Sequence, residues 1–260
     1  MTRNAVGGTA GGAAAVTRAI AVLTALASRG ALTGAALAKL LGLQKSSIAD
    51  VCASLMAEGM VLRRRDAMYI LGPRLEQLGA SLGRSSRLFE LFDRAVLQES
   101  ALEGMTVTLD VLQGAETVCL AARLGRVPLP STPRPGMRTP DLTAAAGSAI
   151  LATAPRDELR QMLERFASHQ SVPAEQIDGL LTAPRSPQQP GRHLAEAPTG
   201  AWHLAVGVPS TAERPLFCAV VVHLPAGDPA DSVRALTDAV VRCARSIGEE
   251  ARQETGPNPV

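Results

Sequence analysis

Residues 32–59 constrain the fold more than any other part of the chain. Their sequence is LTGAALAKLLGLQKSSIADVCASLMAEG, two short runs with apolar residues at helical spacing around a tight turn at Gly42. The second run opens with four side chains that can donate hydrogen bonds to phosphates or base edges: Gln44, Lys45, Ser46 and Ser47. A helix-turn-helix has this form because its second helix enters the DNA major groove with its N-terminus leading. The segment therefore predicts a DNA-binding regulator, not an enzyme.

The flanking residues complete a small domain. Apolar residues recur every three to four positions from Val16 and predict a first helix that ends at Gly30. Residues 34–41 and 45–58 then form the predicted second and third helices. The order of these signals along the chain is that of a three-helix DNA-binding unit.

Two β-rich runs follow, residues 61–65 and 68–71, around a turn at Asp66 and Ala67. A hairpin directly after a helix-turn-helix makes a winged version of the motif. The wing carries the arginines Arg63, Arg64 and Arg65, which we expect to contact the phosphate backbone. The alternative is an exposed basic edge strand whose charges only block aggregation.

The charge distribution agrees with a DNA-binding first part. Residues 1–79 contain nine Lys or Arg and four Asp or Glu (net +5), whereas the remainder contains 17 and 20 (net −3). Aromatic residues make up only 2% of the chain, which argues against a base-stacking RNA or single-strand binder. No apolar run reaches the roughly 18 residues of a membrane span and no signal pattern opens the chain, so we expect a cytoplasmic protein.

The four cysteines are widely scattered and form no C-x-x-C pair. Each lies in an apolar run, which predicts small core residues and neither disulfides nor a zinc-finger type of metal site. Their positions are Cys52, Cys119, Cys218 and Cys243.

The composition divides the chain into four parts. Residues 1–15 hold almost no large apolar side chain and predict a disordered arm. The winged helix-turn-helix covers residues 16–73, and an amphipathic linker helix lies within residues 74–86, with a break at Gly83. Residues 87–254 form the second domain.

The second domain alternates between helical and β-rich segments. Residues 105–112 and 116–122 predict a hairpin, residues 202–208 and 216–224 two later strands, and residues 171–191 a loop or frayed helix. The predicted helices cover residues 87–102, 144–153, 156–166 and 232–252. The expected fold class is therefore α+β, with helices flanking a central antiparallel sheet.

A family resemblance rests on seven segments in fixed order. The chain resembles the IclR-type transcriptional regulators at residues 16–23, 37–48, 54–61, 69–75, 136–152, 204–209 and 217–225. The resemblance implies a winged helix-turn-helix, a linker helix and a GAF-like effector-binding domain. It also implies a dimer or dimer of dimers on a palindromic DNA operator, usually as a repressor, that senses a small organic acid. It implies no catalysis and no cofactor.

The resemblance also places an effector pocket. It implies that the loop and helix start at Thr143, Ala144, Ala145 and Ala146 lie beside the pocket, together with positions on the two late strands. On those strands this chain has His203 where the family has a cysteine, and Val221 and His223 where it has small hydroxyl residues.

The two histidines and the valine bear on the ligand. His203 and His223 are predicted to bind a carboxylate ligand or, alternatively, to be neutral core histidines or metal ligands. Because Trp202 alternates with His203 along a strand, both should not face the pocket. Val221 in place of a polar floor predicts a larger, more apolar effector than a two- or three-carbon acid. The predicted effector is therefore a small organic acid or an apolar metabolite.

A departure in the first domain leaves an alternative function open. Where the family commonly has a basic or histidine pair after the helix start, this chain has Ala49 and Asp50. Asp50 could accept a hydrogen bond from a cytosine amino group or pair with a nearby arginine. It also supports the alternative of a family member that keeps effector binding and dimerisation but has lost DNA binding. No nucleophile elbow, P-loop, dinucleotide fingerprint or zinc-protease motif supports an enzyme.

Overall fold

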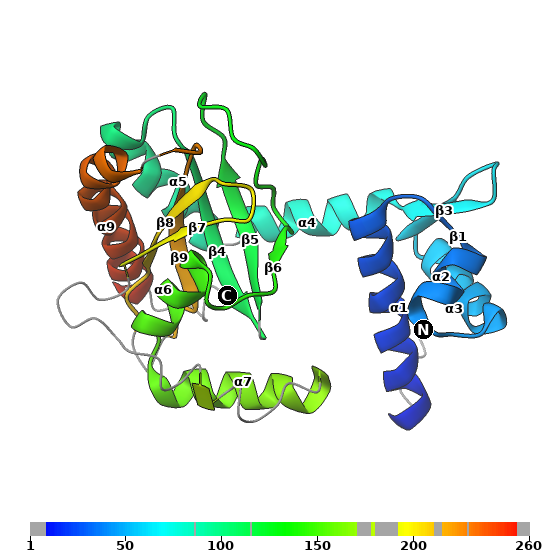
Figure 1. Cartoon of the computed structure of the whole chain (residues 1–260). Coiled ribbons are helices and arrows are strands. Elements are labelled where there is room, and N and C mark those ends of the chain that lie inside the picture. Colours follow the sequence, from blue (N-terminus) through cyan, green and yellow to red (C-terminus); the bar gives the residue numbers. More distant parts are fainter. Residues whose placement is uncertain are drawn as a thin grey trace. The chain divides into compact units, whose positions relative to one another are not determined.

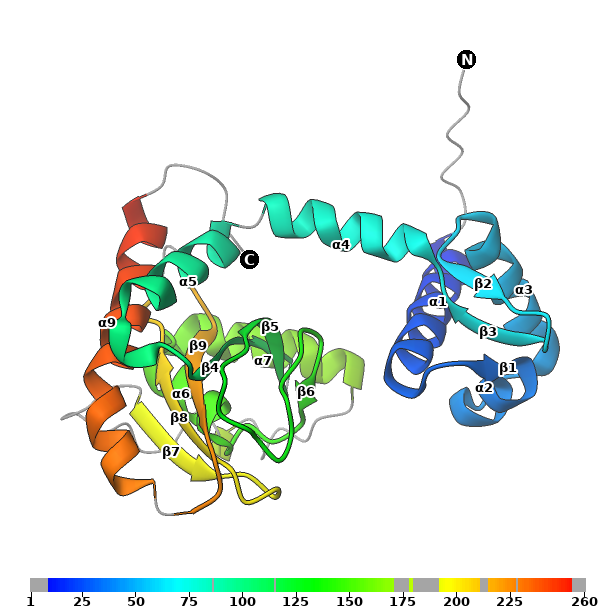
Figure 2. The ribbon, with the colours of Figure 1, turned by 90° about the horizontal axis from the view of Figure 1, so that it is seen from above.

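The computed structural model describes residues 9–85, 87–114, 116–170, 178–179, 192–210, 215–227 and 229–253. Its contacts divide the chain into two units, Met1–Ser85 and Ser86–Val260. Figure 1 labels their helices and strands, and Figure 2 shows them from above.

The first unit is a three-helix bundle with a small sheet. Its elements are α1 (Thr9–Arg29), β1 (Leu32–Thr33), α2 (Gly34–Leu41), α3 (Lys45–Ala57), β2 (Val61–Arg63), β3 (Met68–Leu71) and α4 (Pro73–Ser85). Apolar side chains from α1, α2, α3 and the hairpin meet in one core, in which Leu37 and Ile48 are fully buried. The predicted helix-turn-helix is confirmed.

Local hydrogen bonds set the boundaries of α2 and α3. The Thr33 hydroxyl accepts the Ala36 N–H at 3.2 Å and caps the start of α2. Gly42 then takes a left-handed backbone conformation (φ 64), and the Leu43 N–H donates to the Ala38 carbonyl at 3.0 Å. Glycine adopts this conformation without a side-chain clash, so α2 ends here and α3 begins three residues later.

The hairpin is shorter than predicted and has a third strand beside it. β2 ends at Arg63, because residues 64–67 form the turn and Ala67 has a positive φ of 62. β3 lies in the middle of the sheet, and Tyr69 is opposite both Leu32 of β1 and Arg63 of β2. The sequence did not reveal β1, because two residues are too few to show an alternating pattern.

Two helices of the first unit are longer than predicted. α1 begins at Thr9, so the prediction of a disordered arm is wrong for residues 9–15, where alanines with their high helix propensity offset two glycines. Residues 1–8 lie outside the described residues. α4 continues through Gly83, where a break is predicted, because one glycine costs only about 1 kcal/mol within a longer helix.

The second unit is built on one antiparallel sheet. Its elements are α5 (Arg87–Gln98), η1 (Ser100–Leu102), β4 (Thr106–Gln113), β5 (Glu116–Arg123), β6 (Arg138–Thr139), α6 (Ala145–Thr153), α7 (Arg156–Gln170), β7 (Arg192–Glu196), β8 (Trp202–Gly207), β9 (Cys218–Leu224) and α9 (Ala230–Gln253). The six strands lie in the order β6-β5-β4-β9-β8-β7, with every pairing antiparallel. The predicted α+β class with a central antiparallel sheet is confirmed.

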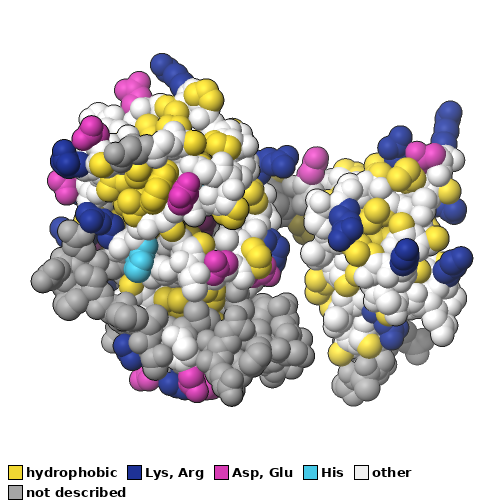
Figure 3. Space-filling model, in the orientation of Figure 1, with side chains coloured by type: hydrophobic (Ala, Val, Ile, Leu, Met, Phe, Trp, Pro, Cys, Tyr) yellow, Lys and Arg dark blue, Asp and Glu magenta, His cyan; other side chains and the backbone are white. Residues whose placement is uncertain are grey.

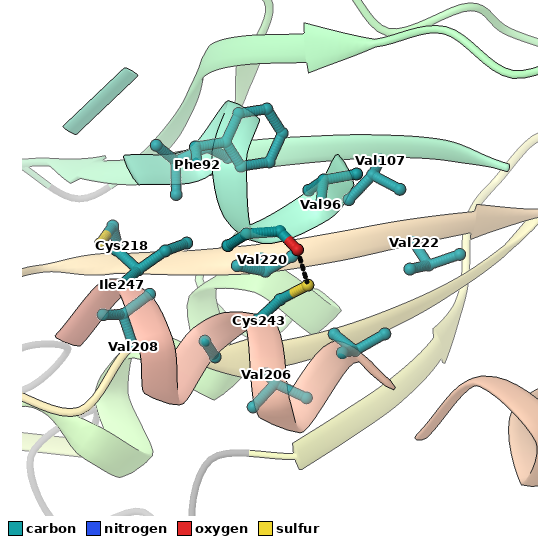
Figure 4. Packing of buried hydrophobic residues seen from close by; sticks show 14 of the residues in the cluster. Phe92, Val96, Val107, Val206, Val208, Cys218, Val220, Val222, Cys243 and Ile247 are labelled. Atoms are coloured by element: carbon teal, nitrogen blue, oxygen red, sulfur yellow. Dashed lines mark hydrogen bonds between the residues drawn. The ribbon is translucent and has the colours of Figure 1, made fainter. Parts of the chain in front are cut away.

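Helices cover both faces of this sheet. α5 and α9 pack on one face, where Phe92, Val220 and Ile247 belong to one buried apolar cluster (Figure 4). In the same cluster the Cys243 thiol donates to the Ala95 carbonyl at 3.2 Å. α6 packs on the other face, and α7 adds Leu159 to the same cluster. Because both faces are covered, all seven residues of β9 are buried, although side chains on a strand alternate between faces.

Three sequence expectations for the second unit have different outcomes. The edge strand β7 was not predicted; it follows directly after the segment 171–191, for which a loop or frayed helix is expected. Of that segment only residues 178–179 are described, and they are helical. All four cysteines are buried, which confirms them as core residues. Within the described residues, no helix combines the length and apolar character needed to cross a membrane.

Candidate DNA interface and ligand cleft

The start of α3 is exposed. Its inner face buries Ile48, Cys52 and Leu55 at helical spacing. This leaves the leading end outside, with the side chains of Gln44, Lys45 and Ser46 exposed and that of Ser47 half-buried. None of these four side chains has a hydrogen-bond or ion-pair partner among the described residues.

The predicted wing arginines differ in how they are held. The Arg63 guanidinium lies 5.7 Å from the centre of the Tyr69 ring, and Arg64 forms an ion pair with Asp66 at 3.5 Å. Arg65 is exposed and has no partner within the described part of the chain. Figure 3 shows Lys and Arg side chains in dark blue spread over the visible face of the first unit. The exposed ion pair between Arg64 and Asp66 is weak, so a DNA phosphate can displace Asp66 from Arg64.

A hollow of about 320 Å³ is lined by residues of α1 and α3, and Asp50 lies on its wall. Arg18, Ser47 and Glu58 line the same hollow. Asp50 is exposed, and its carboxylate forms no ion pair among the described residues, Arg18 included. The alternative in which a nearby arginine pairs with Asp50 therefore has no support in this unit.

The second unit contains a cleft of about 700 Å³ beside the start of α6. Its walls come from the proline-rich segment around β6, the turn between β7 and β8, and the inner strands β8 and β9. The cleft brings together five of the seven residues predicted to bind the effector: Thr143, Ala144, Ala145, His203 and His223.

Ala146 and Val221, the other two residues predicted for the effector, do not line the cleft. Ala146 is 7% exposed and Val221 is 1% exposed, and both belong to the apolar cluster between α6 and the sheet. Val221 shares a sheet face with His223, but α6 covers it. Val221 therefore lies outside the cleft lining, and an apolar pocket floor at this residue stays a prediction.

The two histidines lie side by side on neighbouring strands. His203 of β8 is opposite His223 of β9, and their ring centres are 4.5 Å apart in an edge-on arrangement. Burial lowers the pKa of His203, and burial together with the charge of His203 lowers the pKa of His223 to about 3. Both rings are therefore neutral at pH 7. Trp202 packs in the opposite cluster, so the prediction that it and His203 face different sides is confirmed.

A chain of polar groups continues from His223 into the sheet. The hydroxyl of the buried Thr108 lies 3.0 Å from His223 Nε2, and Asp110 lies two residues further along the same face of β4. Burial raises the pKa of Asp110 to about 6. Asp110 Oδ1 is buried without a partner in the described structure.

Sequence reasoning missed Thr108 and Asp110. The signal was present: Thr106, Thr108 and Asp110 alternate with apolar residues along β4, which places three polar side chains on one face of an otherwise apolar strand.

The charges along the cleft are acidic. Asp141 and Glu196 are the only fully charged side chains among its described lining residues, and no Lys or Arg lies there. Asp141 accepts hydrogen bonds from the Thr143 N–H at 2.7 Å and its hydroxyl at 2.6 Å. Ala144, the residue before α6, provides no side-chain cap, so the first N–H groups of α6 are not satisfied by a side chain. No group of three or more His, Cys, Asp or Glu side chains among the described residues is arranged to hold a metal ion.

Comparison with known proteins decides the family of the first unit. Residues 15–65 match the model of the IclR helix-turn-helix domain. The chain carries an IclR-type DNA-binding domain. This match confirms the IclR-type resemblance that the sequence predicts for the first unit. A comparison with curated protein sequences found no match.

Solved structures of IclR regulators share the fold over nearly the whole chain. An IclR transcriptional regulator from Alicyclobacillus acidocaldarius has a TM-score of 0.69 at 20% identity, covering 91% of this chain and 98% of its own. An IclR-family regulator from Brucella abortus has a TM-score of 0.67 at 16% identity, with 91% and 92% covered. An IclR homologue from Microbacterium hydrocarbonoxydans, in complex with 4-hydroxybenzoate, has a TM-score of 0.58 at 19% identity, with 90% and 98% covered.

Proposed function

We propose that this IclR-type protein is a ligand-responsive transcriptional repressor that binds a palindromic operator as a dimer or a dimer of dimers. The observation that carries the proposal is the free leading end of α3, where Gln44, Lys45 and Ser46 are exposed and have no partner in the described structure. A recognition helix needs such side chains at its N-terminal end, because that end meets the base edges. Since the operator is chromosomal DNA, the proposal also places the protein in the cytoplasm.

The DNA contacts divide into two kinds. Lys45 and the wing arginines Arg63, Arg64 and Arg65 are assigned to phosphates, because cations on flexible chains give affinity without sequence preference. Gln44, Ser46 and Ser47 are assigned to base edges or nearby phosphates, since amides and hydroxyls can both donate and accept.

The effector is a small organic acid bound in the cleft. A volume of about 700 Å³ lies within the range of small-molecule sites. The uncapped start of α6, at Ala144 and Ala145, offers N–H groups and the positive end of the helix dipole to a carboxylate. The 4-hydroxybenzoate in the homologue supports an aromatic acid as one example of this class.

Regulation follows from the dimer. Two recognition helices must lie about one DNA turn apart, so affinity for the operator depends on how the two DNA-binding units are oriented. An effector that binds one arrangement of the effector domains more tightly shifts that orientation, by no more than its differential affinity.

The test is selection of binding sites from a random duplex library, followed by gel shifts with the selected sequence and with the promoter region beside the protein's own gene. We expect a palindromic site bound more tightly than unrelated duplex competitor. The matched variant Gln44→Ala should lose preference at one symmetric pair of positions, because a base contact is removed.

Asp50 supports a second candidate function, in which the protein keeps effector binding and dimerisation without DNA binding. Its carboxylate lies on the exposed face of α3 and repels phosphates. If no duplex is selected, while ligands still raise the melting temperature of the protein, the second function replaces the first.

A further inference from the structure

The described walls of the cleft offer no full positive charge to an acid. The charged side chains among its described lining residues are the carboxylates of Asp141 and Glu196, both exposed. The dipole of α6 contributes only about half an elementary positive charge at the start of that helix. An organic acid that enters as an anion therefore brings a third negative charge, with no cation in the described lining to offset it.

The arginines nearest to the lining in the sequence do not supply that cation. Arg134 and Arg138 adjoin the lining residues Pro133, Met137 and Thr139, but neither lines the cleft. Arg138 donates to Gln113 Oε1 at 3.0 Å and forms an ion pair with Glu116. Its charge is thus already compensated at the edge of the sheet.

The histidine pair is the only part of the described lining that can gain a positive charge. His203 of β8 lies opposite His223 of β9, and their ring centres are 4.5 Å apart. Two positive rings at this distance repel each other, so the pair can gain only one proton. His203 is half-buried whereas His223 is 7% exposed, so a positive charge costs less on His203.

The other ionisable groups packed around the pair bring no positive charge either. On β4, Asp110 shares a sheet face with Thr108, whose hydroxyl lies 3.0 Å from His223 Nε2, and Cys119 of β5 lies opposite Asp110. On β7, His193 lies on the same face, and burial lowers its pKa, so it is neutral at pH 7. α6 has no ionisable side chain.

We propose that the cleft binds its organic acid together with one proton, which His203 takes up from solvent as the carboxylate enters. His203 then becomes the counter-charge of the acid, while His223 stays neutral beside it. This inference rests on the proposed function of the cleft and adds that the response to the effector depends on pH.

The direction of the pH dependence follows from the proton that is bound. Burial lowers the pKa of His203, so this ring is neutral at pH 7 before the acid binds. A complex that holds one more proton than its separate parts loses affinity as the pH rises, by up to about tenfold for each pH unit. The effect of the acid on operator binding should therefore strengthen as the pH falls from 8 to 7.

The first test counts the protons by calorimetry with four acids, benzoate, 4-hydroxybenzoate, phenylacetate and hexanoate. Each is titrated at pH 7.5 in phosphate and in Tris buffer, which differ in their heats of ionisation, so the difference in observed enthalpy gives the proton uptake. For any acid that binds, we expect close to one proton for each molecule bound. Its affinity should fall about five- to tenfold from pH 7 to pH 8.

The outcomes of this test separate the inference from the proposed function. Binding without proton uptake overturns the inference alone. Binding of none of the four acids overturns it together with the organic-acid class of the effector. Neither result affects DNA binding, which the site selection tests separately.

The second test locates the proton with His203→Gln, because glutamine is polar but cannot take up a proton. This variant should bind the acid without proton uptake and about tenfold more weakly at pH 7. The control His193→Gln, at a histidine that does not line the cleft, should keep the uptake. Uptake that persists in His203→Gln places the proton elsewhere and overturns the assignment.

Nitrogen-15 NMR of the wild-type imidazole rings decides the same point should His203→Gln fail to fold. The chain has four histidines, and one ring must change from the neutral to the protonated form when the acid is added at pH 7. Four unchanged rings overturn the inference.

Discussion

The two units of this protein present their recognition groups in opposite ways. The first unit holds solvated, unpaired side chains on the outside of a short helix and a hairpin, and its candidate contacts lie within residues 44–65. The second unit holds neutral, buried side chains at the bottom of a cleft, drawn from strands that are more than a hundred residues apart, as Thr108 and His223 are.

The proposed ligands, duplex DNA and a small molecule, account for this difference. A DNA duplex carries a negative charge at every phosphate. Flexible cations on a helix can therefore bind it at many positions along the duplex, whatever the base sequence. A small molecule offers few contacts, and each must be strong enough to be selective, which requires burial and fixed hydrogen-bond directions. A DNA-binding surface can thus be built from side chains that are neighbours in the sequence. A small-molecule site depends on how distant strands pair, because that pairing brings its side chains together.

The largest expected effect separates the two units. Leu37→Ala removes a fully buried side chain from the core of the first unit and should lower its free energy of unfolding by about 2–5 kcal/mol. We expect loss of DNA binding in gel shifts at 37 °C, with ligand affinity in calorimetry unchanged within about twofold. The control Leu62→Ala, at a side chain that is 45% exposed, should change stability by less than about 0.5 kcal/mol. Equal loss of ligand binding would show that the units do not act separately.

The second effect tests the cost of the buried carboxyl in the sheet. The pKa of Asp110 in the folded protein is about 6, above the ordinary value of 3.8. Above pH 6 the carboxylate is therefore charged and buried in the folded protein, whereas in the unfolded chain the same charge is hydrated, and this difference lowers the free energy of unfolding. Asp110→Asn should therefore raise the free energy of unfolding by about 1–3 kcal/mol at pH 8.

The stabilisation by Asp110→Asn should shrink as the pH falls through 6 toward 4, where the wild-type carboxyl becomes neutral in the folded state. Urea unfolding at pH 8, 6 and 4.5 measures this. The exposed Asp93, paired with Arg123, provides the control Asp93→Asn, which should show no such trend. A pH-independent difference for Asp110→Asn would contradict the raised pKa.

The third effect concerns the exposed cation at the start of α3. Lys45→Ala should weaken binding to all duplexes by about tenfold at 0.1 M salt, and should reduce the slope of log affinity against log salt by about one unit. Fluorescence anisotropy across a salt series gives both values. Arg134→Ala, an exposed cation of the second unit, should leave the slope unchanged. An unchanged slope for Lys45→Ala would remove this residue from the phosphate contacts.

The smallest effect concerns the acidic side chain on the recognition helix. Asp50→Asn removes a negative charge from a surface assigned to a polyanion, and should raise affinity for unrelated duplex DNA by about two- to fivefold at low salt. The increase should fade at high salt, where charges are screened. If binding to the selected operator falls instead, Asp50 makes a base contact, as the cytosine hypothesis requires.

The sequence predicted most of the elements but only part of the site in the second unit. The turn at Gly42 followed from a local signal, a glycine that the structure places in the left-handed conformation at the end of α2. Periodicity alone did not reveal that α1 begins at Thr9 or that β1 and β7 exist, because weak or very short segments carry little periodic signal. Of the residues predicted for the effector, Val221 and Ala146 lie in the apolar cluster between α6 and the sheet, because the sequence does not show which part of a sheet face a helix covers.

By itself the sequence determined the DNA-binding unit, since its helices, turn and wing are specified by residues a few positions apart and its recognition side chains lie next to one another. Only the tertiary structure decided the chemistry of the cleft. Antiparallel pairing of β8 with β9 and of β9 with β4 sets His203 beside His223 and brings Thr108 within 3.0 Å of His223. A shift of one residue in either pairing would turn these side chains to the opposite face, and no local pattern encodes that register.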